Sequence, residues 1–207
     1  MYHLPTILSL SLAAASAAAV PPTTPPLGSV SLSALEVTTK GSACSPGTVG
    51  VALASDNSAL TLIFDNFQAG DGPNAPGTAK RAACTVNIDI NVPGWAFDIV
   101  STDFRGYVYL EQGVVAGLTS SWKRNNGLGK GTTKRTVNGP FSDDFLLHRD
   151  GELSDTEASV CSKNNAKVTI NLIVTVKSGG SKATGLVRGD SLDGGFKQQL
   201  NFAWKKC

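Results

Sequence analysis

Aromatic and charged side chains alternate with apolar ones along the segment 104–111, and this strip has the chemistry of a binding surface. In an extended strand, successive side chains point to opposite faces of the sheet. If the apolar residues face the core, the side chains that point outward are Arg105, Tyr107, Tyr109 and Glu111. Flat aromatic rings with a polar rim are what sugar faces and protein hot spots contact. The spacing therefore predicts a recognition strip, with tyrosines buried in a two-layer core as the alternative.

A nucleophilic active site is harder to assemble from this sequence. After removal of an export signal the chain keeps one histidine, His148, which lies among the acids of the segment 143–150. Those acids could orient its imidazole as in a Ser-His-Asp triad. However, no serine lies in a G-x-S-x-G elbow, and the cysteines are expected to be oxidised. We therefore interpret His148 as an exposed histidine at the end of a strand.

Carboxylates are the other side chains that could perform catalysis, because a glycoside hydrolase needs two of them at a suitable separation. The candidates lie close together in the sequence and are Asp143, Asp144, Asp150, Glu152, Asp155 and Glu157. The same acids could hold calcium, but the D-x-D-x-D-G series of an EF-hand loop is missing. We expect a solvated acidic loop, and no catalytic residue, metal ion or cofactor.

The four cysteines are Cys44, Cys84, Cys161 and Cys207. An even number in an exported chain predicts two disulfides, and zinc is disfavoured because no C-x-x-C spacing occurs. Three pairings are possible, and the sequence does not choose among them. We favour Cys44–Cys84 and Cys161–Cys207, since each bridge then joins strands about 40 to 46 residues apart and would stabilise the fold by about 3 to 4 kcal/mol.

The elements that must position these side chains are strands, because the apolar residues recur with a period of two. The clearest runs cover 84–92 and 168–176, and shorter ones lie at 49–53, 60–64, 104–110 and 200–204. Turn residues separate the runs, and only the acidic stretch 150–160 suggests a short helix. This pattern predicts an all-β, single-domain antiparallel β-sandwich, jelly-roll-like, with a closed barrel as the alternative.

The first residues have the pattern of a secretory signal. The apolar run 4–20 is too short and too interrupted to span a bilayer, and it ends in the small residues that signal peptidase accepts. We predict a signal peptide over 1–19, a Pro/Thr-rich linker over 20–28 and a β-sandwich domain over 29–207. The protein would then be secreted and extracellular, with no membrane partner.

The charge of the chain also limits its partners. The 207 residues include 18 Lys and Arg against 16 Asp and Glu, which gives a formal net charge of +2. Nucleic-acid binding needs a dense basic surface, so a nucleic-acid partner is not expected. The apolar fraction of 41% is too high for a fully disordered chain.

Five short segments carry a family resemblance: CSPGTV at 44–49, PGWAF at 93–97, DFRGYV at 103–108, GPFSDD at 139–144 and WKKC at 204–207. Together with the four cysteines they resemble the fungal secreted family called domain of unknown function 4360, from about Gly41 to the C-terminus. The resemblance implies a small exported fungal protein with a signal peptide. It supplies no catalytic residues.

Two functions from different classes stay open on this basis. The first is a secreted non-enzymatic interaction protein, either a host-directed effector with a role in virulence or a cell-surface protein. The second is a carbohydrate-binding module or a carboxylate-dependent glycoside hydrolase that acts on wall glycans; a structural wall component is a third. The expected partner is a host or cell-wall protein or glycan, and the expected state is a monomer.

Overall fold

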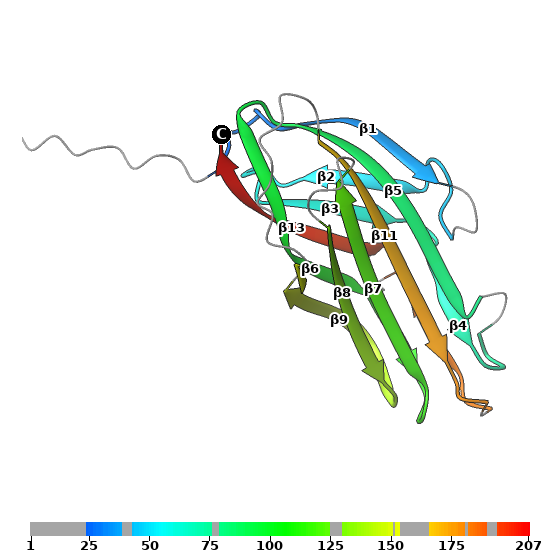
Figure 1. Ribbon diagram of the computed structural model, residues 1–207. Helices are drawn as coiled ribbons and strands as arrows, with labels where there is room; N and C mark the ends of the chain where they lie inside the picture. Colours follow the sequence, from blue (N-terminus) through cyan, green and yellow to red (C-terminus); the bar gives the residue numbers. More distant parts are fainter. Residues whose placement is uncertain are drawn as a thin grey trace, which may run out of the picture.

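Two antiparallel sheets pack against each other in the computed structural model (Figure 1). The structure describes residues 24–38, 43–75, 79–124, 130–150, 152–153, 166–180, 182–189 and 194–207. Thirteen strands and no helix occur within these ranges. The predicted all-β sandwich of antiparallel strands is therefore confirmed.

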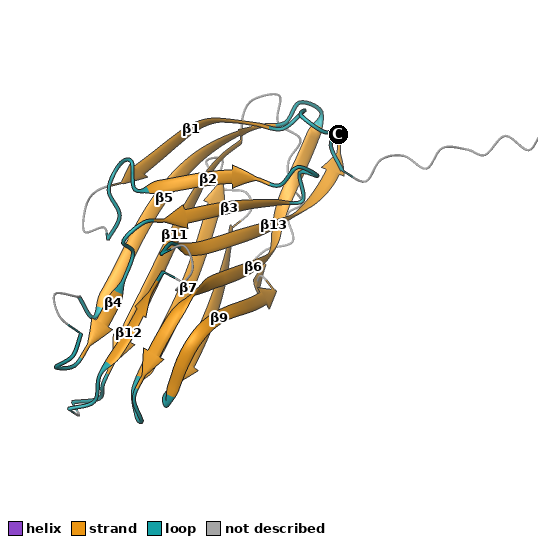
Figure 2. Cartoon of the chain, turned by 180° about the vertical axis from the view of Figure 1, so that it is seen from behind, coloured by secondary structure: helices purple, strands orange, loops and turns teal. Residues whose placement is uncertain are grey.

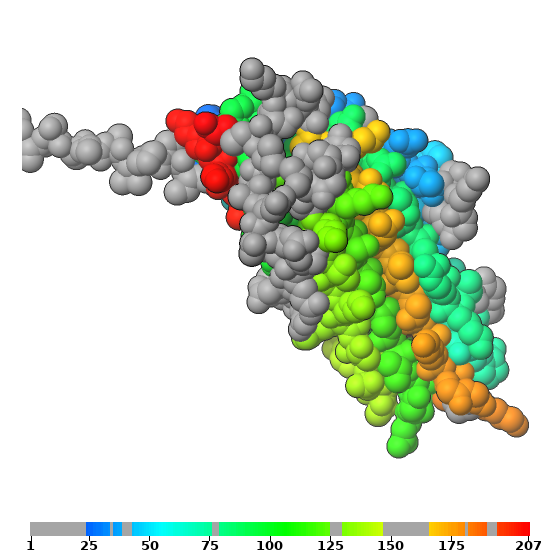
Figure 3. All heavy atoms as spheres, viewed as in Figure 1, coloured from blue at the N-terminus to red at the C-terminus, as the bar shows by residue number. Residues whose placement is uncertain are grey.

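The first sheet has the strand order β1-β5-β11-β7-β8-β10. Its strands are β1 (Ser31–Thr38), β5 (Arg81–Asn91), β11 (Ala166–Lys177), β7 (Val115–Arg124), β8 (Lys130–Asn138) and β10 (Glu152–Leu153). Figure 3 shows the outer face of this sheet, where β5, β11, β7 and β8 lie side by side.

The second sheet has the order β2-β3-β13-β6-β12-β4, and β9 also pairs with β6. Its strands are β2 (Val49–Leu53), β3 (Ala59–Phe64), β4 (Ala69–Asp71), β6 (Trp95–Leu110), β9 (Phe141–Asp150), β12 (Gly185–Arg188) and β13 (Phe196–Lys206). β13 and then β12 follow one edge of β6, and β9 follows the other edge. In the view from behind, β2, β3 and β13 run across the strands of the first sheet (Figure 2).

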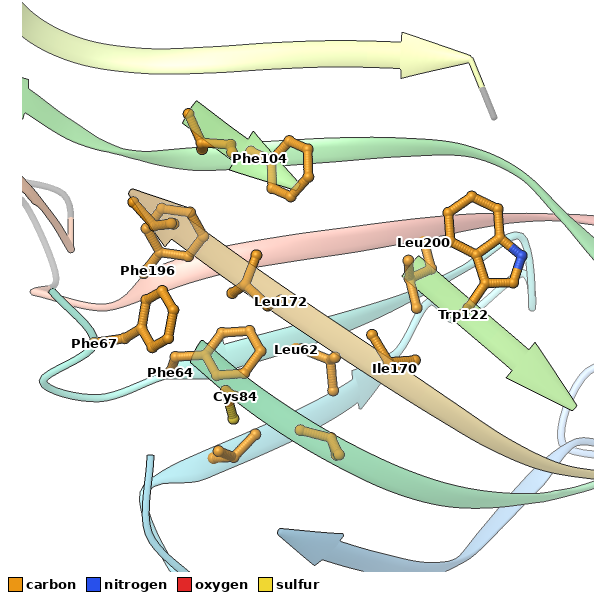
Figure 4. Packing of buried hydrophobic residues seen from close by; sticks show 14 of the residues in the cluster. Leu62, Phe64, Phe67, Cys84, Phe104, Trp122, Ile170, Leu172, Phe196 and Leu200 are labelled. Carbon is orange, nitrogen blue, oxygen red and sulfur yellow. The ribbon is translucent and has the colours of Figure 1, made fainter. Parts of the chain in front are cut away.

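The two longest predicted strands have the alternating burial that their sequence pattern predicts. In β5 and β11 every second side chain is buried and its neighbours are half-buried, as the runs at 84–92 and 168–176 predict. The buried side chains meet those of the second sheet in one apolar core (Figure 4). The rings of Phe64, Phe67 and Phe196 form its aromatic part, with centroids 5.5 to 6.5 Å apart.

Two polar contacts join the sheets, one at the margin of the core and one inside it. The guanidinium of Arg124 on β7 donates to Asp98 on β6 at 3.2 Å, and its Cζ lies 4.5 Å from the centroid of the Phe97 ring. Gln198 on β13 donates through Nε2 to the hydroxyl of Ser120 on β7, and both side chains are fully buried. Because buried polar groups are costly unless they are hydrogen-bonded, these pairs hold the two layers in a defined position.

The short helix predicted over 150–160 is wrong over its first residues. β9 continues to Asp150, which pairs with Ser101, and the segment Glu152–Leu153 forms β10 beside β8. Backbone pairing with existing strands satisfies these amides, so the helix has no advantage there. The rest of the stretch, 154–160, lies outside the described residues. In the part of the chain that is described, no helix could cross a membrane.

One disulfide, Cys44–Cys84, is present as predicted. Its Cα atoms lie 5.6 Å apart, and both residues are buried. The bond ties the segment that precedes β2 to β5, and so it links the second sheet to the first. Cys161 lies outside the described residues, so the second bridge, Cys161–Cys207, stays a prediction.

The N-terminal part of the described chain docks on the sandwich. The buried side-chain amide of Asn57 donates to the carbonyls of Pro25 and Pro26 at 3.2 and 3.1 Å. Pro25 is itself buried. The predicted signal peptide, residues 1–19, lies outside the described residues, and the boundaries of the linker and the domain stay predictions.

Asp71 on β4 holds the start of the turn that follows β11 by hydrogen bonds to Ser178. Its carboxylate accepts the backbone N–H and the hydroxyl of Ser178 at 2.9 and 2.8 Å, and it lies 3.0 Å from Nζ of Lys80. These donors, above all the backbone N–H of Ser178, lower the pKa of Asp71 from 3.8 to about 2. The charged form of this side chain therefore stabilises the folded state.

We expect this stabilisation to disappear in acid. A carboxylate whose pKa is lower in the folded protein stabilises it above the unfolded pKa of 3.8, and this contribution is lost as the pH falls toward about 2. Urea unfolding between about pH 5 and pH 2 should show a smaller loss of stability for Asp71→Asn than for the wild type. Asp65→Asn, at an exposed acid, is the control. Equal losses in all three proteins would contradict this role of Asp71.

Candidate functional site

The outer face of the second sheet carries a groove of about 630 Å³. Its lining residues lie on β2, β3, β13, β6 and β9. Figure 2 shows these five strands following one another across the sheet. Its lining residues come from all five strands and are Ala52, Thr61, Ile63, Lys197, Gln199, Asp103, Arg105, Asp144, Phe145 and Leu146. The inner face of this sheet packs in the core, so the groove lies on the solvent-exposed face.

Strand register brings the charged residues of the groove together. Lys197 on β13 pairs with Arg105 on β6, and Gln199 pairs with Asp103 in the same ladder. On the other edge of β6, Leu146 of β9 pairs with Arg105. Side chains directly opposite each other in such a ladder lie close enough to contact the same ligand. The middle of the groove is therefore a patch of side chains from three adjacent strands, β13, β6 and β9.

Hydrogen bonds fix the floor of this patch. The side-chain amide of Asn201 donates to Asp103 Oδ2 and to the hydroxyl of Ser101, both at 2.9 Å. Gln199 Nε2 donates to Asn201 Oδ1 at 2.8 Å. Each side chain orients the next, so the polar groups are in place before a ligand arrives.

The charges of the groove balance. Among the described lining residues there are two acids, Asp103 and Asp144, and two cations, Arg105 and Lys197. Such a surface offers many donors and acceptors without a net attraction for a strongly charged polymer. Leu146, which is 71% exposed, adds an apolar wall.

The predicted recognition strip is divided between two hollows. Arg105 is exposed and lines the groove, whereas Tyr109 and Glu111 line a second hollow of about 440 Å³. Tyr107 lies between them, half-buried, because the guanidinium of Arg188 packs over its ring at 5.2 Å. The ring of Tyr107 is therefore less exposed than alternation alone predicts, because Arg188 on β12, a strand distant in sequence, covers it.

Hydrogen bonds also hold Tyr109 and Glu111. The hydroxyl of Tyr109 donates to Glu111 Oε1 at 3.0 Å, and Glu111 Oε2 accepts the backbone N–H of Thr184 at 2.7 Å. The hydrogen bond to Glu111 raises the pKa of the Tyr109 hydroxyl, because it stabilises the protonated form. Glu111 thus fixes a ring in one orientation and joins β6 to the segment that leads into β12.

Within the part of the chain that the structure describes, the candidate catalytic residues do not form a catalytic triad or a pair of facing carboxylates. Asp143 and Asp144 are exposed on β9, and Asp144 reaches the groove. His148 pairs with Asp103 in the ladder, but its side chain, like those of Asp150, Glu152, Asp155 and Glu157, lies outside the described residues. No group of three or more metal-binding side chains gathers within the described ranges.

The sequence analysis did not predict several residues of the groove. Lys197 and Gln199 alternate with the buried Phe196, Gln198 and Leu200. This alternation was the available signal, but the polar Gln198 interrupts the apolar series and hides it. Asp103 had the same outward position as Arg105, two residues away, and the strip could have been extended to include it.

The chain has a low structural similarity to two solved carbohydrate-binding modules. TmCBM27, described in a study of specific mannan recognition, has a TM-score of 0.35 and 12% identity, covering 86% of this chain and 90% of that chain. TmCBM61, solved in complex with β-1,4-galactotriose, has a TM-score of 0.23 and 12% identity over 84% and 88% of the two chains. TM-scores this far below 0.5 say nothing about a shared ligand.

The sequence comparisons are more specific. An uncharacterized secreted protein of Arthroderma benhamiae is 34% identical over 172 residues, which cover 83% of this chain and 70% of the relative. It confirms the prediction of a secreted fungal protein. The model of a domain of unknown function, DUF4360, matches residues 31–207. The chain therefore belongs to the DUF4360 family, as its short motifs and its four cysteines predicted.

Proposed function

We propose that this protein is a secreted, non-enzymatic glycan-binding protein that holds a neutral polysaccharide in the groove of its second sheet. The observation that supports this proposal is the charge-balanced, hydrogen-bonding lining of that groove, built on a rigid sheet. An exported protein meets such glycans in the cell wall. An effector role toward a host stays a prediction.

The chemistry of a neutral sugar matches the groove in two ways. Its hydroxyls both donate and accept, so they can pair with carboxylate, guanidinium, ammonium and amide groups placed side by side, as in Asp103, Arg105, Lys197 and Gln199. Its ring also presents C–H groups, for which Ile63 and Leu146 offer apolar contact. A polyanion would meet two carboxylates and a polycation two cations, so neither polymer gains a net attraction from the groove.

The test is a binding assay on the oxidised, secreted protein. Insoluble β-glucan, mannan and chitin serve as neutral probes, polygalacturonate as the anionic probe and chitosan as the cationic one. We expect one of the neutral polymers to retain the protein, and both charged polymers to retain it less. Retention by no neutral polymer, or equal retention by all five, would overturn the proposal.

Arg105→Ala should weaken this binding by about 10- to 100-fold, since a hydrogen bond from a charged group contributes about 1.5 to 3 kcal/mol. Arg105 is exposed, so its removal should leave the fold intact. Arg135→Ala is the matched control, because Arg135 is an exposed arginine on β8 in the other sheet. Titration calorimetry with a soluble fragment of the retained polymer gives the affinities, and an equal affinity for the two variants would contradict the assignment.

A further inference from the structure

The hollow beside Tyr109 lies on the same face of β6 as the groove. Positions 103, 105, 107 and 109 alternate with buried residues, so all of them belong to the outer face of the sheet. Arg105 lines the groove, and Tyr109, four residues farther along β6, lines the second hollow. At about 3.3 Å per residue, these positions are about 13 Å apart.

The adjacent strand β9 accompanies β6 over this whole distance. Leu146 pairs with Arg105, Asp144 with Tyr107 and Ser142 with Tyr109. Asp144 lines the groove and Ser142 lines the second hollow, so β9 joins the two hollows as β6 does. The ring of Tyr107, held by Arg188 and by a contact of 3.2 Å between its hydroxyl and that of Ser142, lies between them.

The second hollow differs from the groove in its chemistry. Its lining includes Pro140, the half-buried ring of Tyr109, and Phe141, which also packs against the core. The carboxylate of Glu111 accepts from Tyr109 and Thr184, so its charge is already hydrogen-bonded. The hollow therefore offers Pro140 and the ring of Tyr109 for apolar contact, beside the polar Gln112 and Ser142, and this combination suits the C–H face of a sugar ring.

The ring of Tyr109 is also fixed in advance. Its hydroxyl bonds to Glu111, and its neighbours across the sheet are Ser142 on β9 and Leu186 on β12. A side chain that is already ordered loses little conformational entropy when a ligand binds. Preorganisation of this kind is what a binding subsite requires.

We propose that the Tyr109 hollow is a second subsite for the ligand of the groove, and that this ligand is a linear neutral glycan longer than a disaccharide, lying along β6 and β9. This inference rests on the proposed function. The groove then supplies hydrogen bonds to one part of the chain, and the platform at Tyr109 supplies contact with a sugar ring farther along it.

The test is the dependence of affinity on ligand length. Oligosaccharides of glucose, mannose and N-acetylglucosamine, from disaccharide to hexasaccharide, are titrated into the wild type and into Tyr109→Ala. We expect the wild type to bind the hexasaccharide of one series at least about tenfold more tightly than its disaccharide. In Tyr109→Ala this gain should be lost while the disaccharide affinity stays the same.

A conservative variant guards against a general effect on the fold. Tyr109→Phe keeps the ring and should retain most of the gain with length, whereas Arg105→Ala should weaken all lengths equally. If the wild type binds short and long oligosaccharides equally, or if Tyr109→Ala lowers all affinities by the same factor, the second subsite is wrong although the glycan-binding function stands. If a neutral polymer retains the protein but no oligosaccharide binds, the second subsite alone is wrong; if no neutral polymer retains it either, both proposals fail.

Discussion

Replacing Phe196 by alanine is expected to lower the free energy of unfolding by about 3 to 5 kcal/mol. This ring is fully buried at the start of β13, and its centroid lies 5.5 Å from that of Phe67, 6.2 Å from Phe145 and 6.5 Å from Phe64. Its removal would leave a cavity where segments from three parts of the chain meet. Urea unfolding followed by tryptophan fluorescence measures the change.

The control for this variant is Leu27→Ala, because Leu27 is 77% exposed. A substitution at such a position should change the free energy by no more than about 0.5 kcal/mol. A loss of about 1 kcal/mol or less in Phe196→Ala would mean that the ring does not fill the core as the structure has it. Since β13 carries Lys197 and Gln199 on its other face, Phe196→Ala should also weaken glycan binding at temperatures near its unfolding transition.

Removal of the Cys44–Cys84 bridge should have the second large effect. The bond closes a loop with a sequence separation of 40 residues, and loop entropy in the unfolded chain then contributes about 3 to 4 kcal/mol. The double variant Cys44→Ala, Cys84→Ala avoids the burial of a new hydroxyl, since both positions are buried. Its unfolding in urea should occur at a clearly lower denaturant concentration than that of the oxidised wild type.

Reduction supplies the matching control. Dithiothreitol should destabilise the wild type by at least as much as the double substitution does, and it should destabilise the variant less. The second predicted bridge, if formed, accounts for whatever loss the reduced variant still shows. A variant as stable as the oxidised wild type would show that the Cys44–Cys84 bond contributes nothing to the fold.

The sequence predicts the strands that alternate without interruption. The runs at 84–92 and 168–176 have apolar side chains at every second position, and they became β5 and β11. β7 and β8 escaped prediction because inward positions such as Ser120 and Thr133 are polar, although both are fully buried. The hydroxyl of Ser120 has its partner, Gln198, on β13 in the other sheet, and period-two counting within one strand cannot see such a contact.

The candidate site could be predicted only in part for a similar reason. Alternation within one strand placed Arg105 on an outer face, and the structure puts it in the groove. The groove itself depends on which strands are neighbours, and β13 lies between β3 and β6 although these strands are far apart in the sequence. The covering of Tyr107 by Arg188 likewise depends on the position of β12.

The hydrogen bond between Gln198 and Ser120 limits the ways in which the two sheets can be aligned. Apolar side chains tolerate many alignments, because contact between them has no direction. The Nε2 atom of Gln198 must meet one hydroxyl, so sliding either sheet by a residue would break this hydrogen bond in a buried place, at a cost of about 1 to 3 kcal/mol. This hydrogen bond therefore fixes the alignment of the two sheets. Because Lys197 and Gln199 flank Gln198 on β13, it also fixes where these two groove residues lie relative to the first sheet.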